Sequence, residues 1–206
     1  MIIVSLFKVL RKILFRLTSI FYTPYAKLIL FLNGVKYSKD LKVNEILKVF
    51  ITRRGIVIFD ENISINSGNN HNIVGRQQKT IFWVEGKLTV GHNTGMSSTA
   101  LICNHEIEIG NNVNLGGNTI IYDTDFHAID PKIRLNKGLD KKEAKKAIVK
   151  IGNNVFTGAH STILKGVTIG DNAVVGACSL VSKDIPTNEI WVGNPIRFIG
   201  RLKGMN

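Results

Sequence analysis

The chain has few of the residues that build disulfide or metal frameworks. Its 206 residues include only two cysteines, Cys103 and Cys178, which lie 75 positions apart with no CxxC pair. Small secreted domains that depend on disulfides have a much denser cysteine pattern. We therefore interpret both cysteines as reduced, packed residues of a cytoplasmic protein.

Acidic residues are also scarce. Aspartate and glutamate together number 15 against 27 lysines and arginines, which gives a net charge of +12. Most of this excess lies in residues 1–54, where only Asp40 and Glu45 oppose eleven basic residues. A protein that binds nucleic acid through its main domain would carry the positive charge on that domain. The distribution therefore predicts no nucleic-acid partner.

The N-terminal part of the chain lacks the uncharged apolar run that a membrane-spanning helix needs. Charges run through its apolar stretch and no small-residue cleavage site follows, which argues against a signal peptide. Apolar residues instead recur every three or four positions over residues 2–21, a pattern that predicts an amphipathic helix. A second apolar run, 28–32, ends at the C-cap signal Asn33-Gly34. Five basic residues give the segment a cationic character: Lys8, Arg11, Lys12, Arg16 and Lys27.

Two interpretations of this segment are open, and they are compatible. Residues 1–32 could lie on an anionic membrane, where each basic residue contributes about 1 kcal/mol. This would hold the protein at the inner face of the plasma membrane. Alternatively, the helix could pack on the main domain and cover the exposed strand edges at its first turn.

The segment from Ile151 to Pro186 has a six-residue period. Cut into sixes it reads IGNNVF, TGAHST, ILKGVT, IGDNAV, VGACSL, VSKDIP, with an aliphatic or threonine residue first in every unit. This period fits neither a helix nor simple strand alternation. It is a hexapeptide repeat, and it predicts an all-β solenoid in which three short strands close each coil. Glycine and asparagine supply the left-handed backbone that the corners need.

The repeat survives an interruption. Ile109 lies 42 residues before Ile151, a multiple of six, so we expect the coils to stay in register while residues 122–148 are extruded as a loop. A loop of this length inside a compact repeat domain is usually functional. The coils over residues 41–102 are less regular. We divide the chain into a helical N-terminal segment (1–40), a β-helix domain (41–190) and a C-terminal tail (191–206).

The repeats, the histidine in the extruded loop and the sequences VSKDIP and GNPIRFI together resemble the left-handed β-helix acyltransferases. The nearest group is the sugar O-acetyltransferases of the maltose, galactoside and capsule or lipopolysaccharide type. The resemblance covers about residues 85–203. It implies a left-handed parallel β-helix, a homotrimer with active sites between subunits, and acetyl-CoA as the acetyl donor.

The resemblance implies a catalytic base in the extruded loop. His127, in DTDFHAID, matches the family's catalytic histidine, and an imidazole can take a hydroxyl proton near neutral pH. Asp123 or Asp125 is close enough in sequence to orient the ring, although either could cap a turn instead. The five histidines lie 21, 13, 22 and 33 residues apart. No pair matches the five-residue spacing of zinc-binding β-helices, so we expect no metal.

The resemblance also places the coenzyme along the C-terminal coils. The Ala159 amide would act as oxyanion donor, Gly158 would allow close approach, and the Ala177 amide one coil later would bind the pantetheine arm. Corner geometry explains the small residues equally well. Phe156 would form an aromatic wall of the coenzyme site. Ser182 and Lys183 would lie next to the adenine and phosphate end of the coenzyme, and Arg197 is a further candidate for phosphate binding.

The acceptor side is predicted from position alone. Asn104 matches a position where relatives contact the sugar. Met96 and Ser97 lie one coil earlier, in a small polar loop that would suit a contact with the acceptor from an adjacent subunit. The predicted function is acetyl-CoA-dependent O-acetylation of a sugar or cell-surface glycan precursor. Two alternatives stay open: N-acetylation of an amino-sugar nucleotide, and a non-catalytic solenoid that binds a membrane partner through its N-terminal helix.

Overall fold

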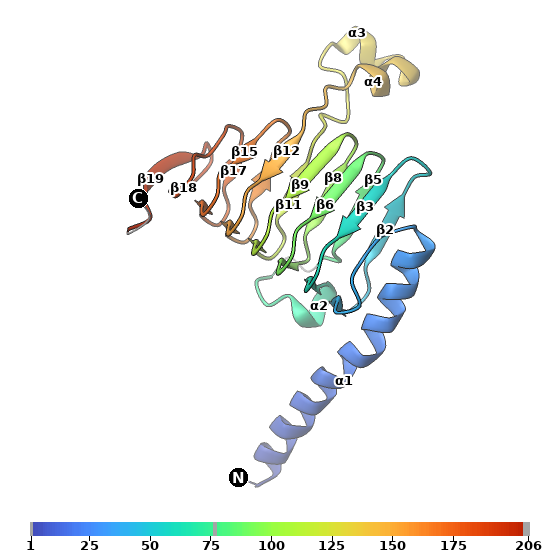
Figure 1. The fold of residues 1–206 in the computed structure, drawn as a ribbon, viewed down its shortest axis with the longest axis vertical. Coiled ribbons are helices and arrows are strands. Elements are labelled where there is room, and N and C mark those ends of the chain that lie inside the picture. Colours follow the sequence, from blue (N-terminus) through green and yellow to red (C-terminus); the bar gives the residue numbers. More distant parts are fainter. Residues whose placement is uncertain (1, 76–77, 204–206) are drawn as a thin grey trace.

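Three parallel sheets form the faces of a triangular prism, and the chain visits them in turn (Figure 1). The computed structural model describes residues 2–75 and 78–203, without the side chains of residues 15, 16 and 19. One face, with eight strands, holds β1 (Lys42–Asn44), β4 (Ser64–Asn66), β7 (Gly95–Ser97), β10 (Asn114–Leu115), β13 (Phe156–Thr157), β16 (Val174–Val175), β18 (Glu189–Val192) and β19 (Arg197–Arg201). We call this face sheet 1.

The other two faces have six and five strands. Sheet 2 contains β2 (Lys48–Ile51), β5 (Ile81–Val84), β8 (Ala100–Cys103), β11 (Ile120–Tyr122), β14 (Thr162–Ile163) and β17 (Leu180–Val181). Sheet 3 contains β3 (Ile56–Phe59), β6 (Lys87–Val90), β9 (Glu106–Ile109), β12 (Val149–Ile151) and β15 (Thr168–Ile169). Successive coils therefore stack in the order predicted by the hexapeptide repeat.

Ladders of aliphatic side chains fill the prism. In sheet 2 one inward position is occupied in successive coils by Phe82, Leu101, Ile121, Ile163 and Val181, all fully buried. Burying a side chain of this size contributes about 1.5–3 kcal/mol. The predicted register is confirmed, because Ile109 pairs with Ile151 across the extruded loop.

Asparagines form a second ladder at the corner between sheets 3 and 1. Each side-chain amide donates to the side-chain oxygen of the next asparagine, at 2.8–3.0 Å. These residues have positive φ, which asparagine adopts more readily than most residues. The members of the ladder are Asn62, Asn93, Asn112, Asn154, Asn172 and Asn188.

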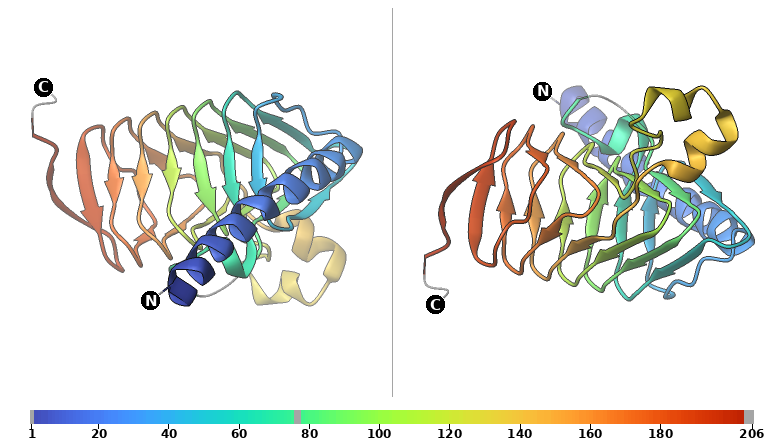
Figure 2. Two further views of the ribbon diagram at one scale, coloured as in Figure 1. Left: turned by 90° about the horizontal axis from the view of Figure 1, so that it is seen from below. Right: turned by 90° about the horizontal axis from the view of Figure 1, so that it is seen from above.

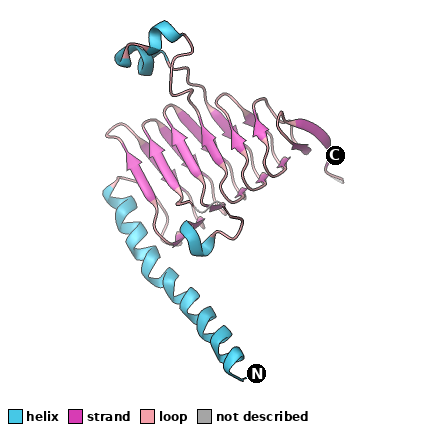
Figure 3. Ribbon diagram, turned by 180° about the vertical axis from the view of Figure 1, so that it is seen from behind, coloured by secondary structure: helices cyan, strands magenta, loops and turns pink. Residues whose placement is uncertain are grey.

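The N-terminal segment forms one helix, α1 (Ile2–Leu32), which includes Pro24. Its last turns cover the first coil with Ala26 and Leu30, both almost completely buried, while its N-terminal half projects away from the β-helix (Figures 1 and 3). The predicted C-cap is confirmed: Gly34 has φ +74°, and the Gly34 and Val35 amides donate to the Phe31 and Leu30 carbonyls. These two bonds define a Schellman motif.

Two segments leave the prism between strands. The first contains α2 (Gly68–His71), between β4 and β5, and accounts for the irregular early coils. The second is the predicted extruded loop, which carries α3 (Pro131–Arg134) and α4 (Lys137–Glu143) and stands clear of the sheets (Figures 1 and 2). The sequence prediction did not include these helices.

The end of the chain is part of the fold. The predicted boundary of the tail at residue 191 is wrong, because it falls inside β18, which pairs in parallel with β16. β19 then returns antiparallel to β18 and is the last strand of sheet 1. Within the described residues, no helix is both long enough and apolar enough to cross a bilayer.

Candidate active site

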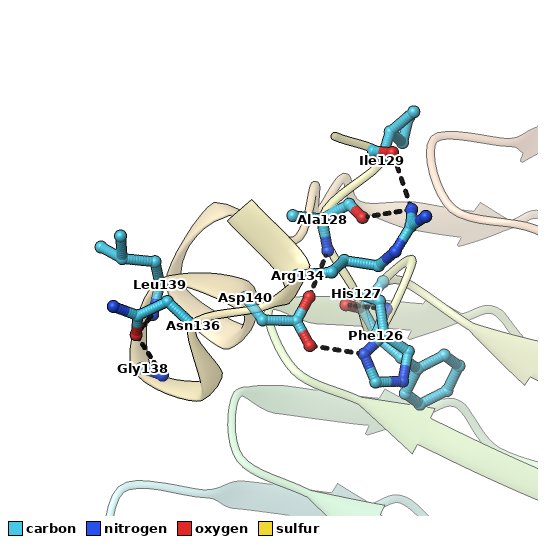
Figure 4. Close-up of polar contacts among 10 residues, drawn as sticks. Phe126, His127, Ala128, Ile129, Arg134, Asn136, Gly138, Leu139 and Asp140 are labelled. Atoms are coloured by element: carbon cyan, nitrogen blue, oxygen red, sulfur yellow. Dashed lines mark hydrogen bonds and ion pairs between the residues drawn. The ribbon is translucent and has the colours of Figure 1, made fainter. Parts of the chain in front are cut away.

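A histidine and a carboxylate meet in the extruded loop (Figure 4). The Nδ1 atom of His127 lies 2.7 Å from Oδ2 of Asp140, and the second carboxylate oxygen, Oδ1, accepts from the Ala128 amide at 2.8 Å. The His127 side chain is 68% exposed, whereas that of Asp140 is 13% exposed. With Nδ1 protonated toward the carboxylate, Nε2 has a free lone pair that can accept a proton.

Short helices hold Asp140 in place. Asn136 caps α4 through its side-chain oxygen, which accepts from the Gly138 and Leu139 amides. Arg134, at the end of α3, donates from Nη1 to the carbonyls of Ala128 and Ile129, the two residues that follow His127. The loop thus fixes the backbone next to His127 from two directions.

The hydrogen bonds to Asp140 keep it ionised. Its pKa is lowered from the ordinary value, chiefly by the hydrogen bond from His127 and then by that from the Ala128 amide. Both donors favour the charged carboxylate over the neutral acid. Asp140 is therefore a carboxylate at neutral pH, ready to accept from Nδ1–H of His127.

The backbone before His127 is unusual. Phe126 has φ +63°, a region that bulky residues rarely adopt. Its amide donates to Thr124 Oγ1, and its ring packs against Tyr122 with centroids 5.5 Å apart. Outliers of this kind persist only where surrounding contacts maintain them, and they are concentrated at functional sites.

The prediction that Asp123 or Asp125 orients the ring is wrong, because Asp140 has that position. Asp123 is completely buried and accepts from the amides of Asn104 and His105, so it holds a corner of the third coil. Asp125 pairs with Lys165 at 2.8 Å. Both aspartates therefore support the base of the loop. Asp140 was missed because it lies 13 residues beyond His127, with no local spacing that connects the two.

His127 borders a cleft of about 710 Å³ between the extruded loop and the outer face of sheet 2. The wall formed by the strands is apolar and includes Ile81, Trp83 and Ile102. Trp83 stacks on Phe50 with ring centroids 4.1 Å apart. The cleft is also lined by Asn104, Glu85, Thr124, Phe126, Gly138, Ala144 and four lysines, Lys48, Lys141, Lys142 and Lys146.

The acceptor candidates separate in the structure. Asn104 lines the cleft with His127, as an acceptor contact would require. Met96 does not lie in a polar loop: it is the central residue of β7 and its side chain is 2% exposed within the core, so the prediction that it contacts an acceptor is wrong. Ser97, on sheet 1, accepts from the Asn66 amide and is not part of the cleft wall.

The two predicted donor amides share an unusual feature. At the corner between sheets 3 and 1, the residue after the corner glycine has its amide bonded to an Asn or Asp side chain of the next coil, as in Asn111 and Asn153. At the corner between sheets 1 and 2, the corresponding amides belong to Ala159 and Ala177. Among the residues that the structure describes, neither finds a hydrogen-bond acceptor.

These amides are well suited to a ligand. Ala177 is exposed and Ala159 is partly exposed, so both residues are accessible to a ligand at this edge of the prism. Neighbouring coils are about 4.8 Å apart, a spacing at which two amides can bind one extended chain. Gly158 has a structural explanation as well, because a Cβ there would overlap the backbone N and Cα of Ala177.

The other donor candidates lie on the C-terminal coils. Phe156 is 48% exposed on sheet 1, two residues before the corner, and can form a wall. Lys183 lies over the ring of Trp191, 5.0 Å from its centroid. Ser182 and Arg197 are also exposed, Arg197 at the start of β19. Within residues 2–75 and 78–203 no cluster of His, Cys, Asp and Glu could hold a metal ion.

The chain matches proteins of one known family. The family model "Bacterial transferase hexapeptide (six repeats)" matches residues 148–183. A maltose O-acetyltransferase structure from Clostridium difficile 630 is 34% identical, with a TM-score of 0.51 and coverage of 69% of this chain and 67% of that one. The chain belongs to the hexapeptide-repeat acetyltransferases. The predicted fold class, a left-handed parallel β-helix, is confirmed with it.

Two further relatives have informative names. The galactoside O-acetyltransferase of Escherichia coli K12 is 39% identical over 102 residues, which are 50% of this chain and 47% of that protein. An N-acyltransferase structure from Bacillus cereus, AntD with dTDP and coenzyme A, is 27% identical, with a TM-score of 0.61 and coverage of 82% of this chain and 84% of that one. The chain spans about half the length of the galactoside acetyltransferases that it matches.

Proposed function

We propose that this protein transfers an acetyl group from acetyl-CoA to a hydroxyl of a sugar or glycan precursor, with His127 as general base. The observation that carries the proposal is the His127–Asp140 pair at the edge of a cleft large enough for a sugar. A relative, the galactoside acetyltransferase, has been solved in complex with coenzyme A, at 30% identity and a TM-score of 0.55. The amides of Ala159 and Ala177, which have no acceptor in the part of the chain that the structure describes, fit such a donor.

In this mechanism the acceptor hydroxyl binds in the cleft beside Nε2 of His127. As the hydroxyl oxygen attacks the thioester carbonyl carbon, its proton passes to Nε2. Asp140 holds Nδ1–H and stabilises the imidazolium that forms. The Ala159 amide donates to the carbonyl oxygen as negative charge develops on it. Collapse expels the thiolate of coenzyme A, which takes the proton back from His127.

A trimer would complete the site. Ala159 lies at the corner between sheets 1 and 2, whereas His127 follows β11 at the corner between sheets 2 and 3. One face of the prism, about five residues or roughly 16 Å at 3.3 Å per residue, separates these corners. A thioester cannot reach both within one chain. A neighbouring chain that presents its Ala159 corner to this His127 would bring the two together.

We also propose that α1 holds the enzyme on the inner face of the membrane. The residues that cover the first coil, Ala26 and Leu30, lie on the same side of the helix as Lys8 and Lys12 at 100° per residue. The apolar side chains on the opposite side of α1 therefore form a stripe that faces away from the β-helix along the full length of α1. Its exposed members are Ile2, Ile3, Leu6, Phe7, Val9, Leu10, Ile13, Leu14, Leu17, Ile20, Phe21, Leu28, Phe31 and Leu32.

The similarity to AntD favours a second candidate, N-acylation of a nucleotide-linked amino sugar. Both reactions need a base and a coenzyme groove. A thiol-release assay with acetyl-CoA across sugars, glycans and amino-sugar nucleotides separates them, with products assigned as esters or amides by mass spectrometry and alkaline lability. Esters support the first proposal and amides the second. If no acceptor in the panel leads to release of coenzyme A, both proposals are refuted.

A further inference from the structure

Four lysines converge on the cleft that holds His127. Lys48 comes from β2 in the first coil, Lys141 and Lys142 come from α4, and Lys146 follows that helix in the chain. All four are exposed to solvent. They are brought together from segments that are almost one hundred residues apart in the sequence.

None of these lysines has a carboxylate partner among the residues that the structure describes. Three other lysines do have one: Lys87 pairs with Glu106 at 2.9 Å, Lys150 with Glu108 at 3.4 Å and Lys165 with Asp125 at 2.8 Å. Glu85 is the one acidic residue in the lining of the cleft, and it makes no ion pair in the described part of the chain.

The cleft is therefore strongly positive. Four lysines and one glutamate line the cleft, so the positive potential of the lysines is not cancelled. The concave, partly apolar wall strengthens this potential inside the cleft. At physiological salt a charge acts over about 8 Å, so lysines around one cleft act on the same ligand. A neutral sugar would gain nothing from this arrangement, whereas an anionic group would.

The opposite wall indicates what carries the anion. Ile81, Trp83 and Ile102 form an apolar surface on sheet 2, and Trp83 is held flat against Phe50. An aromatic face of this kind suits the ring carbons of a sugar, and not an extended polyphosphate. Within one chain the amides proposed for the donor lie at another corner of the prism, so in the proposed trimer a coenzyme reaches this cleft only from the neighbouring chain. These observations favour the acceptor over the coenzyme as the occupant.

We infer that the acceptor is an anionic sugar, with a carboxylate or phosphate held by Lys141, Lys142 and their neighbours and a hydroxyl presented to His127. The inference rests on the proposed acetyl transfer and specifies its substrate class. Trp83 supports the ring, and the lysines fix its orientation through the charged substituent. Negative charge is then a condition for productive binding.

Matched acceptors test this in the full-length protein. Glucose and galactose are compared with the uronates glucuronate and galacturonate. They are also compared with glucose 1-phosphate and galactose 1-phosphate, which keep the 6-hydroxyl. We expect kcat/KM to be at least about tenfold higher for an anionic member of a set at low salt, and to fall steeply as sodium chloride rises from 20 to 500 mM. The uronate and phosphate arms distinguish the two sources of charge.

A double variant locates the effect. Lys141→Gln with Lys142→Gln should reduce the preference for the anionic acceptor at least fivefold, through KM, and leave KM for acetyl-CoA unchanged. Lys137→Gln is the matched control, because Lys137 is exposed on the same helix but outside the cleft. Equal kcat/KM for neutral and anionic members, or a rise in KM for acetyl-CoA in place of the acceptor, would overturn the inference.

A binding measurement separates this inference from the proposed function. Calorimetric titration of the uronates and sugar phosphates into the protein needs no turnover. Lysine-dependent binding without any acetyl transfer would support an anionic ligand and refute the acetyltransferase proposal. Transfer to neutral and anionic sugars alike, with no lysine-dependent binding, would support the enzyme and refute the anionic acceptor.

Discussion

Asp140→Asn tests the histidine–carboxylate pair with almost no change of shape. In the native loop one oxygen of Asp140 accepts from His127 Nδ1 and the other from the Ala128 amide. Asparagine has one acceptor oxygen only. If that oxygen stays with the Ala128 amide, the NH₂ group faces Nδ1 and favours the tautomer with its proton on Nε2. That tautomer cannot act as the base.

The size of the effect follows from the exposure of the pair. A hydrogen bond to a charged group contributes about 1.5–3 kcal/mol when buried. Because the His127 side chain is 68% exposed, we expect about 1–2 kcal/mol here. One factor of ten in rate corresponds to about 1.4 kcal/mol, so kcat should fall about 5- to 30-fold.

The assay is steady-state coenzyme A release, with folding checked by circular dichroism. KM for acetyl-CoA should be unchanged, since Asp140 does not contact the proposed donor residues. The control is Asp130→Asn, which keeps an equally good cap on α3. A change of less than twofold in kcat in the folded variant would refute the role given to Asp140.

Three further predictions concern other parts of the molecule. Cys178 is exposed beside Ala177, so the prediction that both cysteines are packed is wrong for Cys178, whereas Cys103 is buried and burial raises the pKa of its thiol. A thiol reagent should therefore modify one cysteine per native chain, and acetyl-CoA should slow that reaction at least fivefold; no protection would contradict the donor placement. The pKa of Asp140 is lowered in the folded state, so its stabilisation of the loop is fully present above the unfolded pKa of about 3.9 and is lost as pH falls below that value. The rate of hydrogen exchange at the Ala128 amide, corrected for the intrinsic rate, should therefore be constant from pH 7 to 5 and rise below pH 4. A rise already at pH 6 would refute this. The double variant Leu6→Gln with Leu10→Gln should no longer float with anionic vesicles. Its stability should be unchanged, because both side chains are at least half exposed. Equal flotation of variant and native protein would make α1 a structural cap alone.

The repeats made most of the fold predictable. A hexad with an aliphatic first position fixes which side chains stack, and the multiple of six between Ile109 and Ile151 predicted that coils would continue in register past the loop. The same logic failed at Met96. Its apolar side chain fills the inward position of β7, and the surrounding Gly, Ser and Thr residues hid that strand.

The loop of the candidate active site was only partly predictable. His127 was found through its position in the repeat and the family resemblance, but its partner depends on how the loop folds. The signals for α3 and α4 were present: Asp130 before Pro131, and Asn136 before KGLDKKE, are helix N-cap patterns. Even with these helices assigned, only the tertiary fold brings Asp140 to His127. The cleft lysines were missed for the same reason.

The central claim, that His127 is the base of an acetyl transfer, is tested most directly by kcat for coenzyme A release in His127→Ala. A positioned general base contributes about 10²–10⁴-fold, so the variant should lose at least 99% of kcat while its circular dichroism and KM for acetyl-CoA stay native. His105→Ala is the control, an exposed histidine at the corner of a neighbouring coil. If folded His127→Ala keeps more than about a tenth of the native kcat, a barrier change under about 1.4 kcal/mol, His127 is not the base.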